Sequence, residues 1–175
     1  MNKLTDDISI ILDFNLPKWE DLPDFEIYIN QVITIVDNIF SMIPDDGEVR
    51  LTKSMINNYV KWGFIPKPIK RKYAREHVAK LIVITLLKQI LTINQIKKGI
   101  DLQVASYGVS GAYEVFRENF QIAIKQVYSN WAGKDSIKTE IPLSPKELIA
   151  IRAIGNALAL RILTELILKE DGLGK

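Results

Sequence analysis

The chain has 175 residues, and 47% of them are hydrophobic, which is enough to bury a core and too many for a disordered protein. Its 23 basic and 21 acidic residues nearly cancel, and the absence of cysteine excludes disulfides and thiolate metal sites. Charged residues interrupt every long apolar run, so the sequence predicts a cytoplasmic protein without a membrane span.

The first long helix is predicted from Asp24 to about Met42. Asp24 is suited to cap its start, and apolar residues then recur at spacings of 3 and 4, as on one helix face. Phe25 and Tyr28 are expected on this buried stripe. Trp19, between two Leu-Pro bends, is expected to pack into the core.

A second helix is predicted from Lys53 to Trp62, with Thr52 as its cap and Gly63 as the left-handed residue that ends it. Its inward residues are Ile56 and Tyr59, and Trp62 is expected to fill the core. Three polar residues at a spacing of 4 share the opposite face: Lys53, Asn57 and Lys61.

The segment from Phe64 to Tyr73 is too rich in proline for a helix and too basic for a core, so we expect a short two-stranded wing. A helix should follow from Arg75 to about Ile90. Thr92 and Gln95 form a capping-box pair that starts a short helix ending near Gly99. Residues 101–111 are predicted to be a loop.

Two further helices are predicted in the last third of the chain, from Ala112 to Tyr128 and from Ser144 to Lys169. Ser144 and Pro145 form a clear helix start, and the second helix is apolar on most faces. Such a helix is either the centre of a bundle or one side of a homodimer seam. We expect one domain over residues 1–100, with its core at 51–98, and a C-terminal helical region over 101–175 that forms the dimer or encloses a small apolar ligand.

Charge is concentrated on one segment. Residues 50–98 hold twelve Lys or Arg and one acidic residue, a formal charge of +11, whereas residues 1–49 carry −9 and residues 99–175 are neutral. A field of one sign on a short segment is typical of proteins that bind a polyanion. Nucleic acid is the commonest such partner.

The segment from Leu51 to Ile96 resembles the winged helices of mercury-resistance-regulator (MerR) type proteins. Thr52 to Pro66 is similar to the recognition helix and first wing strand, with matches at Ile56, Tyr59, Gly63 and Phe64-Ile65-Pro66. Arg71-Lys72-Tyr73 resembles the wing exit, and Thr92 to Ile96 resembles a later helix start. Asn57 stands where that family uses an arginine. The resemblance implies an all-α fold with a winged helix-turn-helix-like core, a small β-ribbon at the wing, and DNA binding.

A second resemblance is to an uncharacterised bacterial family of unknown function. Its near-fixed motif Thr-x-Ser-Met-Ile-Asn-Asn-Tyr-Val-Lys is similar to residues 52–61, and its Lys-Tyr-x-Arg-x-His is similar to residues 72–77. This resemblance brings no activity with it.

The candidate contacts to double-stranded DNA come from the predicted helix and wing. Helix residues would enter the major groove, where Asn pairs with adenine and Lys with guanine, and wing residues would lie on phosphates or in the minor groove. The candidate DNA-binding residues are Lys53, Asn57, Asn58, Tyr59, Lys61, Lys67, Lys70, Arg71, Lys72, Tyr73 and Arg75. Two alternatives stay open: the bases form a solvated face, or they bind an acidic protein segment, including the N-terminal segment of this chain.

No set of residues suited to catalysis or to metal or cofactor binding is found. His77 is the only histidine, which is too few for an ordinary zinc site, and we interpret it as a helix-start residue. The sequence therefore predicts a non-enzymatic transcriptional regulator that binds DNA as a homodimer, with a protein–protein adaptor that uses the same basic face as the alternative.

Overall fold

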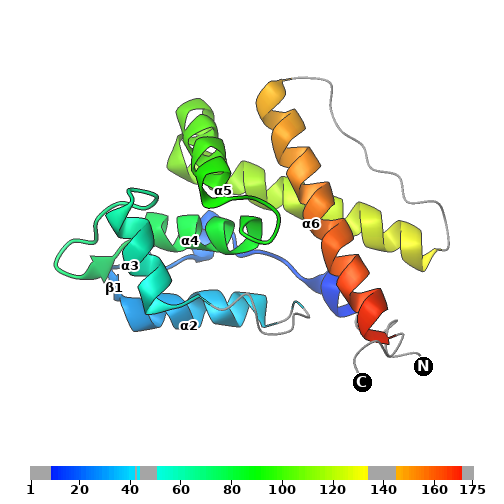
Figure 1. The fold of residues 1–175 in the computed structure, drawn as a ribbon, viewed down its shortest axis with the longest axis horizontal. Coiled ribbons are helices and arrows are strands. Elements are labelled where there is room, and N and C mark those ends of the chain that lie inside the picture. The colour runs from blue at the N-terminus through cyan, green and yellow to red at the C-terminus, as the bar shows by residue number, and fades with distance from the viewer. Residues whose placement is uncertain (1–8, 42, 44–50, 134–144, 171–175) are drawn as a thin grey trace. The chain divides into compact units, whose positions relative to one another are not determined.

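The computed structural model describes residues 9–41, 43, 51–133 and 145–170. The expected all-α character is confirmed, because helices dominate these residues and the only sheet among them has two short strands (Figure 1). After a short helical stretch at residues 9–13, the elements are η1 (Trp19–Asp21), β1 (Ile27–Tyr28), α2 (Ile29–Phe40), α3 (Lys53–Lys61), β2 (Lys72–Tyr73), α4 (Arg75–Leu87), α5 (Ile93–Ala132) and α6 (Lys146–Glu170).

The described residues form two compact units. One unit contains residues 17–41 and 51–115, and the other contains residues 9–16, 43, 116–133 and 145–170. We call them the α3 unit and the α6 unit after the helix that each contains. The organisation predicted from the sequence, with a boundary near residue 100, remains a prediction.

The start of the first long helix was wrongly predicted at Asp24. Residues 27 and 28 instead form β1, which pairs antiparallel with β2 in the register Ile27↔Tyr73 and Tyr28↔Lys72. Strand pairing holds these two residues extended, and α2 begins only at Ile29, where the Tyr28 N–H donates to Gln31 Oε1 at 2.8 Å. Consequently Phe25 and Tyr28 are exposed, against expectation.

The core of the α3 unit surrounds α4. Every residue from His77 to Leu87 is buried except Lys80, which is half-buried, so α4 has almost no solvated face along most of its length. Helix α2 packs against α3 and α4 (Figure 1). Val32 and Val36 of α2 and Ile56 of α3 are fully buried. This burial fixes the orientation of α3 and leaves its other face toward solvent.

Helix α5 corrects a second expectation. Neither the predicted helix end near Gly99 nor the loop at 101–111 is present, because α5 continues through both. Its predicted start is confirmed: the Thr92 N–H donates to Gln95 Oε1 at 2.9 Å, and the Gln95 N–H donates to Thr92 Oγ1 at 3.4 Å. Gly108, inside the predicted loop, is the one residue with non-helical angles (φ 69°, ψ 175°), a region open essentially to glycine alone. The helix kinks there.

The α6 unit packs the last part of α5 against α6 and residues 9–16. Gly155 brings α6 close to α5, since an added Cβ would lie 3.2 Å from the Asn119 carbonyl oxygen and 3.3 Å from Ala123 Cβ. Phe14 packs edge-on against Phe120, and Gln121 Nε2 donates to the Phe14 carbonyl. Helix α6 was correctly predicted, although its proposed cap, Ser144, lies outside the described residues.

Candidate nucleic-acid interface

Helix α3 presents the polar face that the sequence predicts. Its start is held as expected by Thr52, whose Oγ1 accepts from the Met55 N–H at 3.2 Å, and Gly63 follows its end at φ 70°. Ile56 and Tyr59 are buried, whereas the three residues of the opposite face are exposed. These three are Lys53, Asn57 and Lys61, and Asn58 beside them is half-buried.

A tight turn follows between α3 and β2. The chain first folds back onto α3, where the Phe64 N–H donates to the Tyr59 carbonyl at 2.8 Å. The Lys72 N–H then donates to the Ile69 carbonyl at 2.8 Å, and an antiparallel bridge pairs these two residues. The central residues of this turn, Lys70 and Arg71, both have positive φ, at 49° and 65°. The turn is anchored by β2 to β1, so the second strand of the predicted wing pairs with β1.

Tyrosine and arginine candidates lie deeper than the lysines. Tyr59 and Tyr73 are only 5% and 4% exposed, and burial raises the pKa of both phenols. Arg75 Nε donates to the Pro23 carbonyl at 3.4 Å, and its guanidinium lies 5.7 Å from the centre of the Trp19 ring. These three side chains are engaged within the chain, so we do not count them among the candidate DNA contacts.

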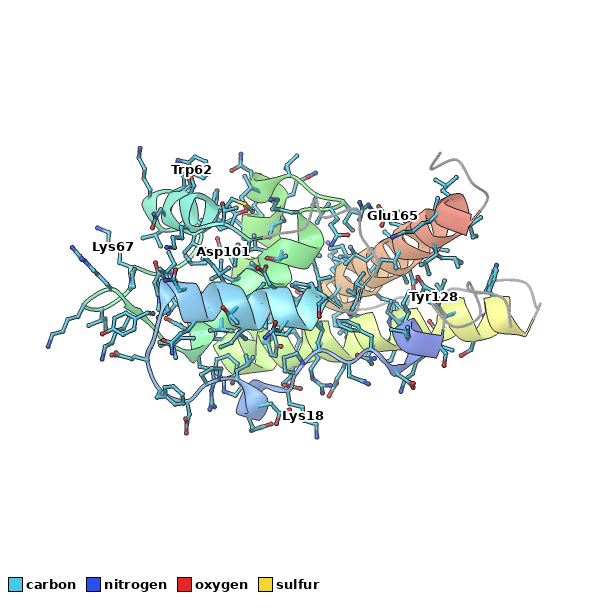
Figure 2. The ribbon with its side chains drawn as sticks, turned by 90° about the horizontal axis from the view of Figure 1, so that it is seen from below. Lys18, Trp62, Lys67, Asp101, Tyr128 and Glu165 are labelled. Carbon is cyan, nitrogen blue, oxygen red and sulfur yellow. The ribbon has the colours of Figure 1, made fainter. Side chains whose placement is uncertain are left out.

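Trp62 was expected in the core, and this expectation is wrong. Its side chain is 54% exposed, and Figure 2 shows it pointing outward from the end of α3. The ring packs edge-on against Phe64, with centroids 5.9 Å apart, and Phe64 packs in the same way on Tyr59 at 6.3 Å. The chain reversal at Gly63 brings Phe64 and Ile65 to the apolar side of α3, and Trp62 is left at the surface.

Six cations of α3 and the turn form what we call the cationic surface: Lys53, Lys61, Lys67, Lys70, Arg71 and Lys72. All but Lys72, which is half-buried, are exposed, and Figure 2 shows Lys67 extending away from the ribbon. Lys72 Nζ lies 5.9 Å from the centre of the Tyr28 ring. In the described part of the chain, no carboxylate forms a salt bridge with any of the six. None of the described acidic residues of the N-terminal segment therefore forms a salt bridge with this surface.

His77 lies at the start of α4, as predicted. It is buried, and its Nδ1 accepts from the Ala74 N–H at 3.0 Å, the role that Glu or Gln has in a capping box. Burial lowers its pKa, and the nearby Glu76 carboxylate partly offsets that effect. Within residues 9–41, 43, 51–133 and 145–170, no three acidic or histidine side chains are grouped so that they could hold a metal ion. Over the same residues, no helix has the length and hydropathy to cross a membrane.

Sequence reasoning missed two exposed apolar side chains next to the cationic surface, Trp62 and Ile69. Ile69 is 66% exposed and lies within the basic turn. The sequence does contain a signal for Ile69, because a lone isoleucine between prolines and bases has no apolar periodicity to join. Trp62 offered no such signal, since it continues the apolar residues of α3.

Together these features define a mostly helical protein with a cluster of exposed cations on one helix and the turn that follows it. The chain belongs to the family described as domain of unknown function (DUF1836), which matches residues 17–131. The expected membership of an uncharacterised family is thereby confirmed. No curated protein and no solved structure matches the chain.

Proposed function

We propose that this protein is a DNA-binding transcriptional regulator without enzymatic activity, built on a winged helix-turn-helix-like core of α2, α3, the turn at residues 66–72 and α4. The observation that carries the proposal is the cationic surface. These six cations have no carboxylate partner among the described residues and remain solvated. A polyanion such as DNA would supply the negative charges that balance them. A duplex also offers grooves that fit a helix and a hairpin.

Helix α3 is the element that would read bases. An α-helix fits the major groove, where Asn57 is able to pair with N6 and N7 of adenine and a lysine with the acceptors of guanine. Each such contact contributes roughly 1–3 kcal/mol of discrimination between bases. Lys67, Lys70 and Arg71 in the turn would contact phosphates and fix the position of α3 in the groove.

A homodimer through α6 would place two copies of α3 on one duplex. Support comes from the solvent-facing side of α6, where uncharged residues recur at spacings of 3 and 4. These are Ala157, Leu160, Thr164 and Leu168, and all four are exposed. Pairing of α6 with α6 of a second copy would bury these four residues. The resulting two-fold symmetric dimer would bind the two half-sites of an inverted repeat. Sedimentation velocity tests this, and Leu160→Glu should convert dimer to monomer.

The deciding experiment measures duplex affinity as a function of salt concentration. A DNA binder loses affinity with a slope of log K against log salt of about −0.9 for each phosphate neutralised. Selection of bound fragments from a random duplex library then tests sequence specificity, and enriched inverted repeats would support the dimer as well. Affinity that responds neither to salt nor to sequence would contradict the proposal.

The exposed Trp62 favours a second candidate, an adaptor that binds an acidic protein. Tryptophan and arginine are enriched among the residues that dominate protein–protein binding energy, and both lie in this region. An adaptor would bind an acidic partner and show no preference among duplex sequences, which the library selection distinguishes.

A further inference from the structure

Ile69 is the unusual residue of the turn. It is 66% exposed, although four cations lie within three positions of it in the sequence: Lys67, Lys70, Arg71 and Lys72. An isolated exposed isoleucine needs no explanation on an ordinary surface. Here, however, the residues that follow Ile69 in the turn have a strained backbone, which indicates that its position serves a function.

The strain lies in the two residues after it. Lys70 and Arg71 both have φ in the left-handed region, which is unfavourable for any residue that carries a Cβ. Glycine or asparagine would fit these positions better. Strained backbone of this kind concentrates where residues contact ligands. The turn therefore keeps two cations at a conformational cost, directly beside the exposed isoleucine.

Strand pairing decides which way Ile69 faces. Ile69 pairs with Lys72 across an antiparallel bridge, and Lys72 pairs in turn with Tyr28 of β1. Directly paired residues project from the same side of a ribbon, so Ile69, Lys72 and Tyr28 share one side. The neighbouring pair, Ile27 and Tyr73, is buried on the other side. An aliphatic, a cationic and an aromatic side chain thus lie together on an exposed face.

Resting on the proposed DNA binding, we propose that Ile69 is an apolar wedge that enters the minor groove and partly unstacks one base step while the flanking cations hold the phosphates. Proteins that bend DNA insert isoleucine, leucine, phenylalanine or proline in this way, and flexible steps such as TA open most easily. The cations argue for a polyanionic occupant over an apolar protein groove. This face would thus select duplexes whose base steps deform easily, independently of the base contacts made by α3.

The chain offers a matched control for the wedge. Phe25 lies in the same unit and is equally exposed, at 66%, but its neighbours Asp24 and Glu26 are acidic. Truncating Phe25 removes a similar exposed apolar surface without touching the basic turn. The set of variants is Ile69→Ala, Ile69→Leu and Phe25→Ala, each with its thermal unfolding compared with that of the unmodified chain.

The probes are two duplexes of equal length, one A·T-rich with central TA steps and one G·C-rich. 2-Aminopurine is placed at successive steps of each, because its fluorescence rises when stacking is lost. The full chain should bind the TA duplex more tightly and brighten the probe at one step. Ile69→Ala should keep the salt slope, lose the fluorescence rise, and bind the TA duplex roughly tenfold more weakly, equivalent to about 1.4 kcal/mol. Ile69→Leu and Phe25→Ala should behave as the unmodified chain.

The outcomes separate the wedge from the proposed function. Steep salt-dependent binding without any fluorescence rise overturns the wedge and leaves DNA binding standing. An unchanged fluorescence rise with Ile69→Ala, or an equal loss with Phe25→Ala, also overturns the wedge. If the unmodified chain binds neither duplex, both the proposed function and the wedge are wrong.

Discussion

The cationic surface differs from the arginines of α6 in its partners, although elsewhere in the α3 unit Lys97 pairs with Asp101 at 2.6 Å. In the α6 unit, Arg152 donates to Asn119 Oδ1 at 3.0 Å, and Arg161 pairs with Glu165 at 2.6 Å. In the α3 unit, the six residues of the cationic surface have no carboxylate partner among the described residues. Arg152 joins α6 to α5 and the Arg161–Glu165 pair lies within α6, whereas solvated cations add little to folding and remain free to bind.

Both units bury polar atoms without a hydrogen-bond partner among the described residues, Thr85 Oγ1 being one in the α3 unit. The α6 unit buries the Tyr128 hydroxyl and the Asn156 amide without a hydrogen-bond partner among the described residues, which lowers its stability. Exposed polar residues of α3 carry no such cost, because water hydrates them. We therefore expect changes on α3 to affect binding and changes between α5 and α6 to affect folding.

The largest expected effect comes from removing two cations of α3. Lys53→Ala combined with Lys61→Ala should weaken duplex binding about 100-fold at low salt and reduce the salt slope by about 1.8. The free energy of unfolding should be unchanged, because both lysine side chains are exposed. Fluorescence anisotropy over a salt series measures both quantities. The matched control is Lys88→Ala with Lys125→Ala, which removes two exposed lysines elsewhere; an equal loss of binding in this control would contradict a localised interface.

Next in size is the effect of filling the close approach at Gly155. Gly155→Ala should destabilise the protein by about 1–3 kcal/mol, because the new methyl meets the backbone of α5 at 3.2 Å. Gly99, also helical, has nothing within 4 Å of an added Cβ, so Gly99→Ala should stabilise by up to about 1 kcal/mol. Urea unfolding measures both changes. Equal effects of the two variants would show that α5 and α6 are not closely packed at Gly155.

A smaller gain is expected from Tyr128→Phe. The hydroxyl is fully buried without a hydrogen-bond partner in the described residues, and burial, with a smaller contribution from Glu165, strongly raises the pKa of the phenol. Removing the oxygen should stabilise the protein by about 1 kcal/mol and raise Tm by about 2–4 °C. Calorimetry tests this, and a fall in Tm would indicate that the hydroxyl has a partner after all.

The smallest effect concerns pH and His77. Its pKa is lowered in the folded protein by burial, so below the ordinary value of 6.5 the unfolded chain binds more protons. Stability is therefore full above that value and decreases as pH falls toward the lowered pKa. His77→Asn keeps an acceptor for the Ala74 N–H but cannot titrate. Between pH 7 and pH 5, the urea midpoint of the unmodified chain should fall further than that of the variant; parallel decreases would contradict this.

Features set by residues close in the sequence were predicted well. The Thr52 cap, the left-handed Gly63, the Thr92–Gln95 capping box and the place of His77 each depend on a turn or two of chain, so a short sequence contains all that they need. The polar face of α3 was predicted for the same reason, because helix periodicity alone puts Lys53, Asn57 and Lys61 on one side.

Features that depend on distant residues were not predicted. Pairing of Ile27 with Tyr73 across 46 positions removed the first turn from the expected helix and exposed Phe25 and Tyr28. Exposure of Trp62 followed from the packing of Phe64 and Ile65, and exposure of Ile69 from a turn anchored to β1. The sequence alone determined where charge lies and where α3, α4 and α6 lie, because charge and helix periodicity are local properties. Only the tertiary structure decided which apolar side chains reach the surface, because burial depends on which distant segment packs against each side chain.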